Sequence, residues 1–421
     1  MSDKVLNTSK PQIITFGCRL NTYESEVMRD HAEQQSLDNA IIINTCAVTN
    51  EAERQARQAI RKARRENPEA YIIVTGCSVQ INPEFYATMP EVDRVLGNHE
   101  KMQKKHFYRQ VSDKVHVTDI MEIKETANHL ISGFENRSRA FIQIQNGCNH
   151  RCTFCTIPYG RGNNRSVPMG EISQQIATLL ENDCQEIVFT GVDITDYGKD
   201  LPGFPTLGQM TKRVLKQHPS LTRLRLTSLD PSEVEETLFD IIASENRLMP
   251  HFHISLQAGD NMILKRMKRR HLREDVINFC NKIRSLKSDA VFGADIIAGF
   301  PTETEEMFQN SLKLVEECNI TYLHVFPYSA KKDTPAARMP QVPGDLIKER
   351  AQRLRALGKI QLDKFLKSRL GLEETILMEA NLRGRTNHYA PAKIIETPAK
   401  EGQILKAKVV DIKDQTLIIK G

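Results

Sequence analysis

The sequence predicts an α/β protein in three parts: an N-terminal domain with a parallel sheet, a central partial (β/α) barrel, and a small all-β barrel at the C-terminus. In the first two parts, short apolar runs alternate with helical segments, which is typical of parallel sheets. From about residue 370 onward the apolar runs become short, β-branched and closely spaced, which favours a small barrel. We therefore place the domains at residues 11–130, 134–369 and 370–421.

The N-terminal domain is expected to contain three buried strands, at Pro11 to Gly17, Ala40 to Thr45 and Ala70 to Gly76. Helical patterns occupy Thr22 to Glu33 and Asn50 to Asn67 between them. Each strand is followed by a cysteine. Because the carboxyl ends of parallel strands meet at one edge of a sheet, these cysteines should converge. They are Cys18, Cys46 and Cys77.

The central domain repeats this alternation of strands and helices. Its predicted strands are Phe141 to Gln145, Glu186 to Thr190, Arg223 to Thr227, His253 to Leu256, Ala294 to Ile297 and Tyr322 to Pro327. A charged helix at about Asp345 to Arg369 closes the domain. The predicted strands of the terminal barrel are Thr375 to Glu379, Tyr389 to Ile395, Gln403 to Ile412 and Gln415 to Ile419.

Composition narrows the class of protein. No apolar run approaches the roughly 20 residues that a membrane span needs, and the polar N-terminus lacks the apolar core of a secretory signal. We therefore expect a cytoplasmic protein that does not contact a membrane. Nine cysteines without an export signal argue against a disulfide framework and favour bound metal where cysteines cluster.

The most specific motif is CxxxCxxC, formed by Cys148, Cys152 and Cys155 directly after a predicted strand. Three thiolates at this spacing can bind one face of a cubic iron–sulfur cluster and leave the fourth iron open to a ligand. Zinc is the alternative, but a structural zinc site needs a fourth ligand. His150 is available for that role, although its position between the cysteines makes tetrahedral closure awkward.

This motif, with Phe154 before its last cysteine, resembles the radical S-adenosylmethionine (SAM) superfamily. The resemblance implies that the cluster on Cys148, Cys152 and Cys155 binds SAM and generates a 5′-deoxyadenosyl radical. The segments Gly17–Asn21, Asn44–Thr49 and Thr75–Cys77 resemble the N-terminal domain of radical SAM methylthiotransferases. That resemblance implies a second, auxiliary [4Fe-4S] cluster on Cys18, Cys46 and Cys77, and no catalytic residue beyond the cluster ligands.

Further segments at predicted strand ends resemble the parts of this family that contact SAM. The residues that the resemblance assigns to cofactor binding are Thr190, Gly191, Asp193, Ser228, Ser255, Gln257, Arg269, Asp295 and Tyr328. A zwitterionic amino acid and a ribose require polar groups at several strand tips, which agrees with this assignment.

Two segments are candidates for binding RNA. Arginines recur every three or four residues on the helix after Cys46, as a stripe suited to a phosphate backbone, although a merely solvated face is the alternative. The segment Gly384–Tyr389 resembles the RNA-binding TRAM domain. The candidate residues are Arg54, Arg57, Arg61, Arg64, Arg385 and Tyr389.

The resemblance implies a tRNA methylthiotransferase that uses two [4Fe-4S] clusters and SAM. The run Gly17–Glu24 is closest to the branch that adds sulfur and a methyl group at C2 of N6-threonylcarbamoyladenosine, next to the tRNA anticodon. N6-isopentenyladenosine is the alternative substrate. An RNA-binding protein with structural metal sites and no catalytic activity is the alternative of a different class. The expected partners are the tRNA anticodon stem-loop and an electron donor, and a monomer is favoured.

Overall fold

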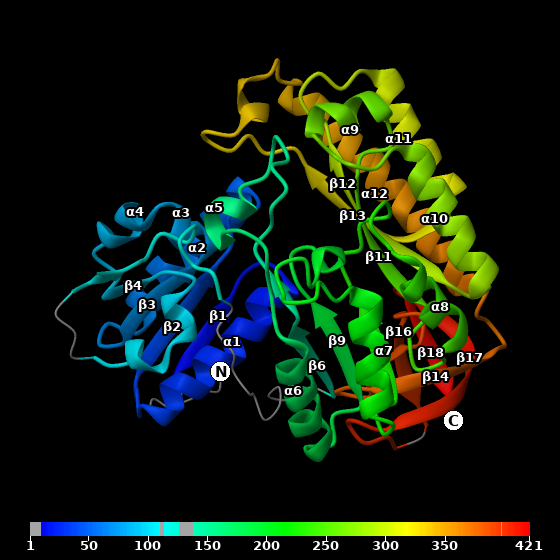
Figure 1. Ribbon diagram of the computed structural model, residues 1–421, viewed down its shortest axis with the longest axis horizontal. Helices are drawn as coiled ribbons and strands as arrows, with labels where there is room; N and C mark the ends of the chain where they lie inside the picture. Colours follow the sequence, from blue (N-terminus) through cyan, green and yellow to red (C-terminus); the bar gives the residue numbers. More distant parts are fainter. Residues whose placement is uncertain (1–9, 110–112, 126–137, 397) are drawn as a thin grey trace. The chain divides into compact units, whose positions relative to one another are not determined.

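The computed structural model describes residues 10–109, 113–125, 138–396 and 398–421, which form two compact units (Figure 1). Unit 1 comprises the described residues of Met1–Ile131 together with Gln145–Arg151 and Cys155–Ser166. Unit 2 comprises the described residues of Ser132–Ile144 together with Cys152–Phe154 and Val167–Gly421. The terminal barrel therefore belongs to the same unit as the central domain. The boundary predicted between residues 130 and 134 lies outside the described residues.

Unit 1 is built on a parallel sheet with the strand order β1-β2-β3-β4-β5. These strands are Gln12–Thr15, Ala40–Thr45, Tyr71–Gly76, Arg94–Leu96 and Val115–His116. Side chains alternate between the two faces of a strand. Ile41 and Ile43 pack with Ile60 of α2 (Asn50–Glu66), whereas Ile42 packs with Met28 of α1 (Arg19–Gln34). The two helices therefore cover opposite faces of the sheet.

The remaining elements of unit 1 are short and lie around the ends of these strands. They are α3 (Cys77–Ile81), α4 (Pro83–Ala87), η1 (Glu100–Met102), η2 (Lys104–His106), β7 (Gln145–Asn146), α5 (Ile157–Arg161) and β8 (Arg165–Ser166). The pair β7 and β8 is antiparallel. The loop that holds Cys148 lies between these two strands.

Unit 2 contains all six of the strands predicted for the central domain, in two parallel sheets ordered β10-β9-β6 and β11-β12-β13. The strands are β6 (Arg139–Gln143), β9 (Glu186–Thr190), β10 (Arg223–Leu226), β11 (His251–Gln257), β12 (Val291–Ala298) and β13 (Ile320–Pro327). Its helical elements are α6 (Met169–Glu181), η3 (Ile194–Asp196), α7 (Leu207–Gln217), α8 (Glu236–Ser244), α9 (Asn261–Met267), α10 (Arg273–Leu286), α11 (Glu305–Glu317), η4 (Pro335–Arg338) and α12 (Gly344–Lys367). Among the described residues, no helix is both long and apolar enough to cross a membrane.

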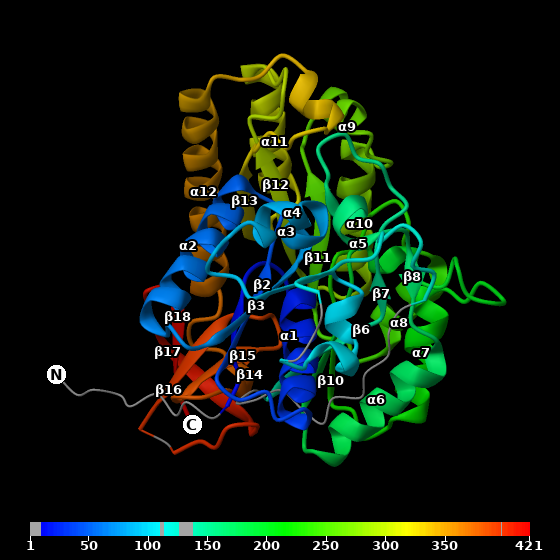
Figure 2. The ribbon, with the colours of Figure 1, turned by 90° about the vertical axis from the view of Figure 1, so that its left-hand side faces the viewer.

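The terminal strands close into a barrel with the order β14-β15-β16-β18-β17, which Figure 2 shows next to the end of α12. They are β14 (Glu373–Met378), β15 (Arg383–Thr386), β16 (Pro391–Ile395), β17 (Ile404–Lys413) and β18 (Thr416–Lys420). Strand β15 was not predicted, because its sequence Arg-Gly-Arg-Thr has no apolar side chain. It forms because antiparallel partners on both sides supply its backbone hydrogen bonds.

A buried carboxylate joins the strands of unit 2 at their amino ends. Glu186, the first residue of β9, is fully buried and forms ion pairs with Arg139 of β6 and with Arg223 and Arg225 of β10. The Glu186–Arg223 distance is 2.7 Å and the Glu186–Arg225 distance is 2.8 Å. Burial by itself raises the pKa of Glu186, but the three arginines hold it well below its ordinary value. The carboxylate therefore stays charged wherever the protein is folded.

We predict that Glu186→Gln destabilises unit 2 by about 3–5 kcal/mol, because it leaves buried guanidinium groups without their shared anion. Urea unfolding followed by circular dichroism measures the loss. The control is Glu236→Gln, since Glu236 is 82% exposed and its pair with Lys282 lies at the surface. The depressed pKa adds a pH signature: the contribution of Glu186 is present above its unfolded pKa of about 4.3 and is lost as the pH falls below it. Equal losses in the two variants would contradict the prediction.

Candidate active site

The three N-terminal cysteines follow neighbouring strands of the unit 1 sheet. Cys18 precedes the first residue of α1, Cys46 follows β2, and Cys77 is the first residue of α3. The strands are paired in register to these ends, with Thr15 opposite Asn44 and Thr45 opposite Gly76. The sheet therefore brings the three cysteine loops to one edge, as the sequence predicted.

Two glycines allow these loops to approach closely. Gly17 has a φ of +98°, and a Cβ at this position would lie 2.9 Å from the Sγ of Cys46. Gly76 has a φ of +103°, and a Cβ there would lie 2.3 Å from the carbonyl oxygen of Thr45. A side chain at either position would be strained and would clash, so glycine is required for this arrangement.

The thiols of this edge act on one another electrostatically. Burial raises the pKa of Cys46 to about 12, and the charges of Cys77 and Cys18 contribute in the same direction. As a free cysteine, Cys46 is therefore difficult to ionise. Bound metal removes this difficulty, because a thiolate ligand then neutralises positive charge. The donor set therefore fits an iron–sulfur cluster.

A buried ion network lies in the same unit. The carboxylate of Glu24 on α1 is 2.6 Å from the Nζ of Lys101 and 2.8 Å from an Nη atom of Arg161 on α5. All three side chains are almost inaccessible to solvent. Arg161 also donates to the side chain of Asn21 at 2.5 Å, and Asn21 donates to the backbone of Phe16 and Thr45. The network therefore braces the two loops that hold Cys18 and Cys46.

The same helix α5 contacts the loop of Cys77. A Cβ at Gly160 would lie 3.2 Å from the Cβ of Cys77, and Asn98 donates both to the Cys77 Sγ at 3.7 Å and to the Gly160 carbonyl at 2.5 Å. Burial by itself lowers the pKa of Arg161, but the charges of Cys77, Glu24 and Cys18 raise it well above its ordinary value. A permanent positive charge is thus held near the thiols.

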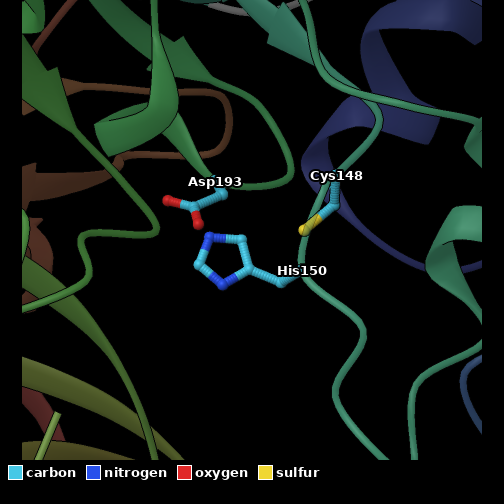
Figure 3. Close-up of side chains that lie close together, drawn as sticks. All are labelled: Cys148, His150 and Asp193. Atoms are coloured by element: carbon cyan, nitrogen blue, oxygen red, sulfur yellow. The ribbon is translucent and has the colours of Figure 1, made fainter. Parts of the chain in front are cut away.

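The CxxxCxxC loop divides between the two units. Figure 3 shows Cys148 and His150 on the loop after β7, which belongs to unit 1, and Asp193 on the loop after β9 of unit 2. The backbone N–H of Cys148 donates to the Gly162 carbonyl at 3.0 Å. A ring nitrogen of His150 lies within 4.8 Å of the Cys148 Sγ, so the histidine that zinc would need is close to this cysteine.

Cys152 is anchored within unit 2. Arg269 places one Nη atom 3.8 Å from the Cys152 Sγ, and its other Nη atom is 2.7 Å from Asp230 and 2.9 Å from the Ser255 carbonyl. Thr153 donates its hydroxyl to the Arg266 carbonyl at 2.8 Å. These contacts connect the middle cysteine to the ends of β10 and β11, where the cofactor residues were predicted.

The residues predicted to bind SAM lie at the strand ends of unit 2. Thr190 ends β9, Ser228 follows β10, and Gln257 ends β11. Ser228 and Gln257 have φ values of +55° and +67°, so the chain turns sharply at both residues. The other residues of this set follow the same strands or lie on β11 and β12: Gly191, Asp193, Ser255, Asp295 and, after β13, Tyr328. Direct contact with SAM remains a prediction for all of them.

The arginine stripe on α2 is only partly available to a ligand. Arg61 is exposed, and Arg54 pairs at the surface with Glu51. Arg57 lies over the ring of Phe85. Arg64 instead donates to the carbonyls of Pro68, Ala70 and Glu91 and to the Asp93 carboxylate, so it holds the end of α2 to the sheet. These contacts give Arg64 a structural role, and its binding to RNA stays a prediction.

Arg385 and Tyr389 are also engaged within the protein. The Tyr389 ring stacks on His251, with 5.1 Å between the ring centroids, and the guanidinium carbons of Arg139, Arg225 and Arg385 lie 4.8–5.1 Å from its centroid. Arg385 donates to the Tyr389 carbonyl. These contacts join the terminal barrel to the core of unit 2. That Arg385 and Tyr389 also contact RNA stays a prediction. The sequence showed the residue types but not the surface that they cover.

Several residues of the site were not predicted. Glu24, Lys101 and Arg161 form their network across long stretches of sequence, and Asp230 contacts Arg269 and His271 while almost completely buried. The sequence carries only a weak signal for these residues. Each is a charged residue in an otherwise apolar helical or strand-end segment, and a charged residue is rarely buried unless it has a partner.

Comparison with known proteins identifies the class of this chain. Residues 142–315 match the radical SAM superfamily, and residues 10–97 match the uncharacterized protein family UPF0004. The radical SAM methyltransferase TsrM from Kitasatospora setae shares the fold, with a TM-score of 0.52, 14% identity and coverage of 76% of this chain and 69% of that one. The chain is a radical SAM protein.

Curated relatives define the family more narrowly. The threonylcarbamoyladenosine tRNA methylthiotransferase MtaB of Rickettsia prowazekii is 55% identical, over 97% of this chain and 96% of the relative. The protein of the same name from Aquifex aeolicus is 35% identical over 90% and 95%. A tRNA-2-methylthio-N(6)-dimethylallyladenosine synthase of Carboxydothermus hydrogenoformans is 31% identical over 95% and 96%. The chain belongs to the family of radical SAM tRNA methylthiotransferases.

Proposed function

We propose that this protein attaches a methylthio group to C2 of N6-threonylcarbamoyladenosine next to the anticodon of tRNA. The observation that carries the proposal is 55% identity over nearly the whole chain to a relative named for this nucleoside. Two relatives named for dimethylallyladenosine, from Carboxydothermus hydrogenoformans and Clostridium botulinum, are about as long but 31% and 30% identical. An RNA-binding protein without catalytic activity gives no reason for two separate sets of three cysteines.

Two [4Fe-4S] clusters and SAM are the cofactors of this reaction. Cys18, Cys46 and Cys77 would hold the auxiliary cluster, and Cys148, Cys152 and Cys155 would hold the cluster that binds SAM. When bound, these groups supply a radical able to remove an aromatic hydrogen and a sulfur to replace it. Cys46 is buried and Gly17 places no side chain against its Sγ, whereas Cys18 is exposed.

The charged residues position these groups. Arg269 would hold Cys152 and the end of β11 in fixed relation, because one guanidinium contacts both. In unit 1, burial lowers the pKa of Lys101, whereas the charges of Cys77, Glu24 and Cys18 raise the pKa of Arg161, so Arg161 keeps a positive charge next to the cysteines. A cluster held by three thiolates would carry negative charge, which Arg161 would offset.

The exposed arginines of α2 would contact the RNA backbone. Arg61 is free of the structural contacts that hold Arg64, and Arg54 and Arg57 flank it on the same stripe. Guanidinium groups on an exposed helix contact phosphates without reading base sequence. These arginines of α2 would therefore bind the anticodon stem-loop through its phosphate backbone.

The substrate is tested by nucleoside mass spectrometry of tRNA incubated with anaerobically reconstituted protein, SAM and a reductant. We expect methylthiolation of tRNA that carries threonylcarbamoyladenosine and none of tRNA that carries dimethylallyladenosine. Modification of the dimethylallyl nucleoside alone would reject the proposed substrate. Production of 5′-deoxyadenosine with neither nucleoside changed would reject both substrates and keep the radical chemistry.

The two cysteine sets are separated by replacing each one with alanine. The variant lacking Cys148, Cys152 and Cys155 is expected to lose about half of its iron and all 5′-deoxyadenosine formation. The variant lacking Cys18, Cys46 and Cys77 should lose a similar amount of iron, keep 5′-deoxyadenosine formation and yield no methylthio product. Replacing the buried core residue Cys280 is the control and should leave the iron content unchanged. Full iron content in either triple variant would contradict the assignment.

The charge balance predicts the effect of Arg161 on the auxiliary cluster. Arg161→Gln removes one buried positive charge, so the reduced and more negative cluster is destabilised and its midpoint potential falls, on the order of tens of millivolts. Arg161→Lys keeps the charge and is the matched control. Redox titration by electron paramagnetic resonance measures the potential, in protein that also lacks Cys148, Cys152 and Cys155. An equal shift in both variants would show that hydrogen bonding rather than charge is responsible.

A further inference from the structure

Three polar side chains meet on one face of the sheet β11-β12-β13 in unit 2. The Nε2 of His253 and the Nδ1 of His324 lie 3.0 Å and 3.1 Å from the same Oδ1 atom of Asp295. The two imidazole rings are 5.1 Å apart between centroids. One carboxylate oxygen therefore accepts hydrogen bonds from both histidines. We call these three residues the His–Asp–His cluster.

The sheet is built to hold this cluster. Asp295 and His324 are register partners on β12 and β13, and His253 is the register partner of Gly293. A Cβ at Gly293 would lie 2.7 Å from the Nδ1 of His253, so the glycine makes room for the ring. The intervening residues Ile254 and Ala294 point to the other face and are fully buried. The cluster thus occupies the face that is not filled by the core.

The side chains of the cluster become progressively more exposed. The exposed fractions are 10% for His253, 30% for Asp295 and 54% for His324. Burial by itself raises the pKa of Asp295, but hydrogen bonds from both histidines hold it below its ordinary value. Asp295 engages the Nδ1 of His324, so Nε2 is the ring nitrogen through which this half-exposed side chain can meet a ligand. With Asp295 at one ring nitrogen and a ligand carboxylate at the other, the imidazole would bridge two acceptors by charge-assisted hydrogen bonds.

The cluster lies close to the predicted cofactor residues. Ser255 is two residues beyond His253 on β11, and its carbonyl shares Arg269 with the Sγ of Cys152. Two residues along a strand span about 7 Å, and the register of β11 against β12 shifts between Ile254 and Gln257. The cluster is thus one step deeper in the sheet than the position where Cys152 is anchored. A substituent on a base held at these strand ends would extend towards it.

We propose that His324, oriented by Asp295 and His253, binds the carboxylate of the threonyl group on the substrate nucleoside. This inference rests on the proposed function. In threonylcarbamoyladenosine the threonine is attached through its nitrogen, so its carboxylate and hydroxyl are free. A dimethylallyl group is wholly apolar and gives the Nε2 of His324 no hydrogen-bond partner. A polar group held in place for one substituent therefore disfavours the other.

The test compares the natural anticodon stem-loop with one in which the threonyl carboxylate is converted to a neutral amide. For the wild-type protein, conversion should lower kcat/KM about 10- to 100-fold, as loss of a charge-assisted hydrogen bond does. In His324→Gln the natural RNA should lose a similar factor, and the ratio of acid to amide should fall towards one. RNA affinity, measured by fluorescence anisotropy, should follow the same pattern.

Two further variants separate recognition from structure. His324→Lys supplies a cationic donor at this position and should retain a preference for the acid. His218→Gln, at the end of α7, is the control and should behave as wild type. Circular dichroism and iron content check that each variant is folded and carries its clusters.

Several outcomes would overturn the inference. An unchanged acid-to-amide ratio in His324→Gln would reject recognition of the carboxylate while leaving the proposed function intact. A raised KM for SAM, or slower 5′-deoxyadenosine formation in the absence of RNA, would assign the cluster to the cofactor. Two histidines and a carboxylate can also bind a divalent metal. If the wild-type protein carries one metal ion in addition to its cluster iron and His324→Gln lacks that ion, the His–Asp–His cluster is a metal site instead. A wild-type protein that modifies no threonylcarbamoyl RNA would reject both proposals.

Discussion

The position of α5 depends on one buried carboxylate. Glu24 accepts from Lys101 and Arg161, which come from distant parts of the chain, and none of the three is exposed. A buried charge is tolerated only when it is paired, so the pairs fix α5 against α1 and η1. Since α5 follows Cys155 within six residues and packs on Cys77, the network joins the end of one cysteine motif to the other within unit 1. Arrangement of the metal ligands thus follows from ion pairing as much as from the sheet.

Unit 2 uses the same principle at the opposite end of its strands. Glu186 collects arginines from β6 and β10 at the amino ends of these strands, and Tyr389 of the terminal barrel packs on two of them. Ion pairs and cation–π contacts therefore pack that end of the sheet. The carboxyl ends remain for polar loops, which is where parallel α/β folds place their chemistry. Stability and function are assigned to different ends of the same strands.

The sequence was most informative where local pattern determines the outcome. The strand ends that carry Cys18, Cys46 and Cys77 were predicted because parallel strands end at a common edge, and the structure places them there. Contacts between distant segments were not predicted. Asp295 was recognised as a strand-end residue, but its pairing with His324 follows from strand register, which the sequence does not display. Arg64 and Tyr389 look like RNA-binding residues in sequence, and only the folded chain shows the carbonyls and rings that already engage them.

One face of β11 and β13 shows how these constraints combine. At its amino end, His251 and Tyr322 pack with each other and His251 with Tyr389, so the face is closed there. The His–Asp–His cluster comes next, and Ser255 with its link to Cys152 lies nearest the carboxyl end. Reaction at C2 of an adenine requires the ring to be held in one orientation. N1 separates C2 from C6, which carries the N6 substituent, so a protein can orient the ring by binding this substituent. A polar contact deep in the sheet would hold that substituent while leaving C2 towards the strand ends. The face is thus packed shut at the amino end of the strands, would bind the N6 substituent in the middle, and would place the reacting C2 at the carboxyl end.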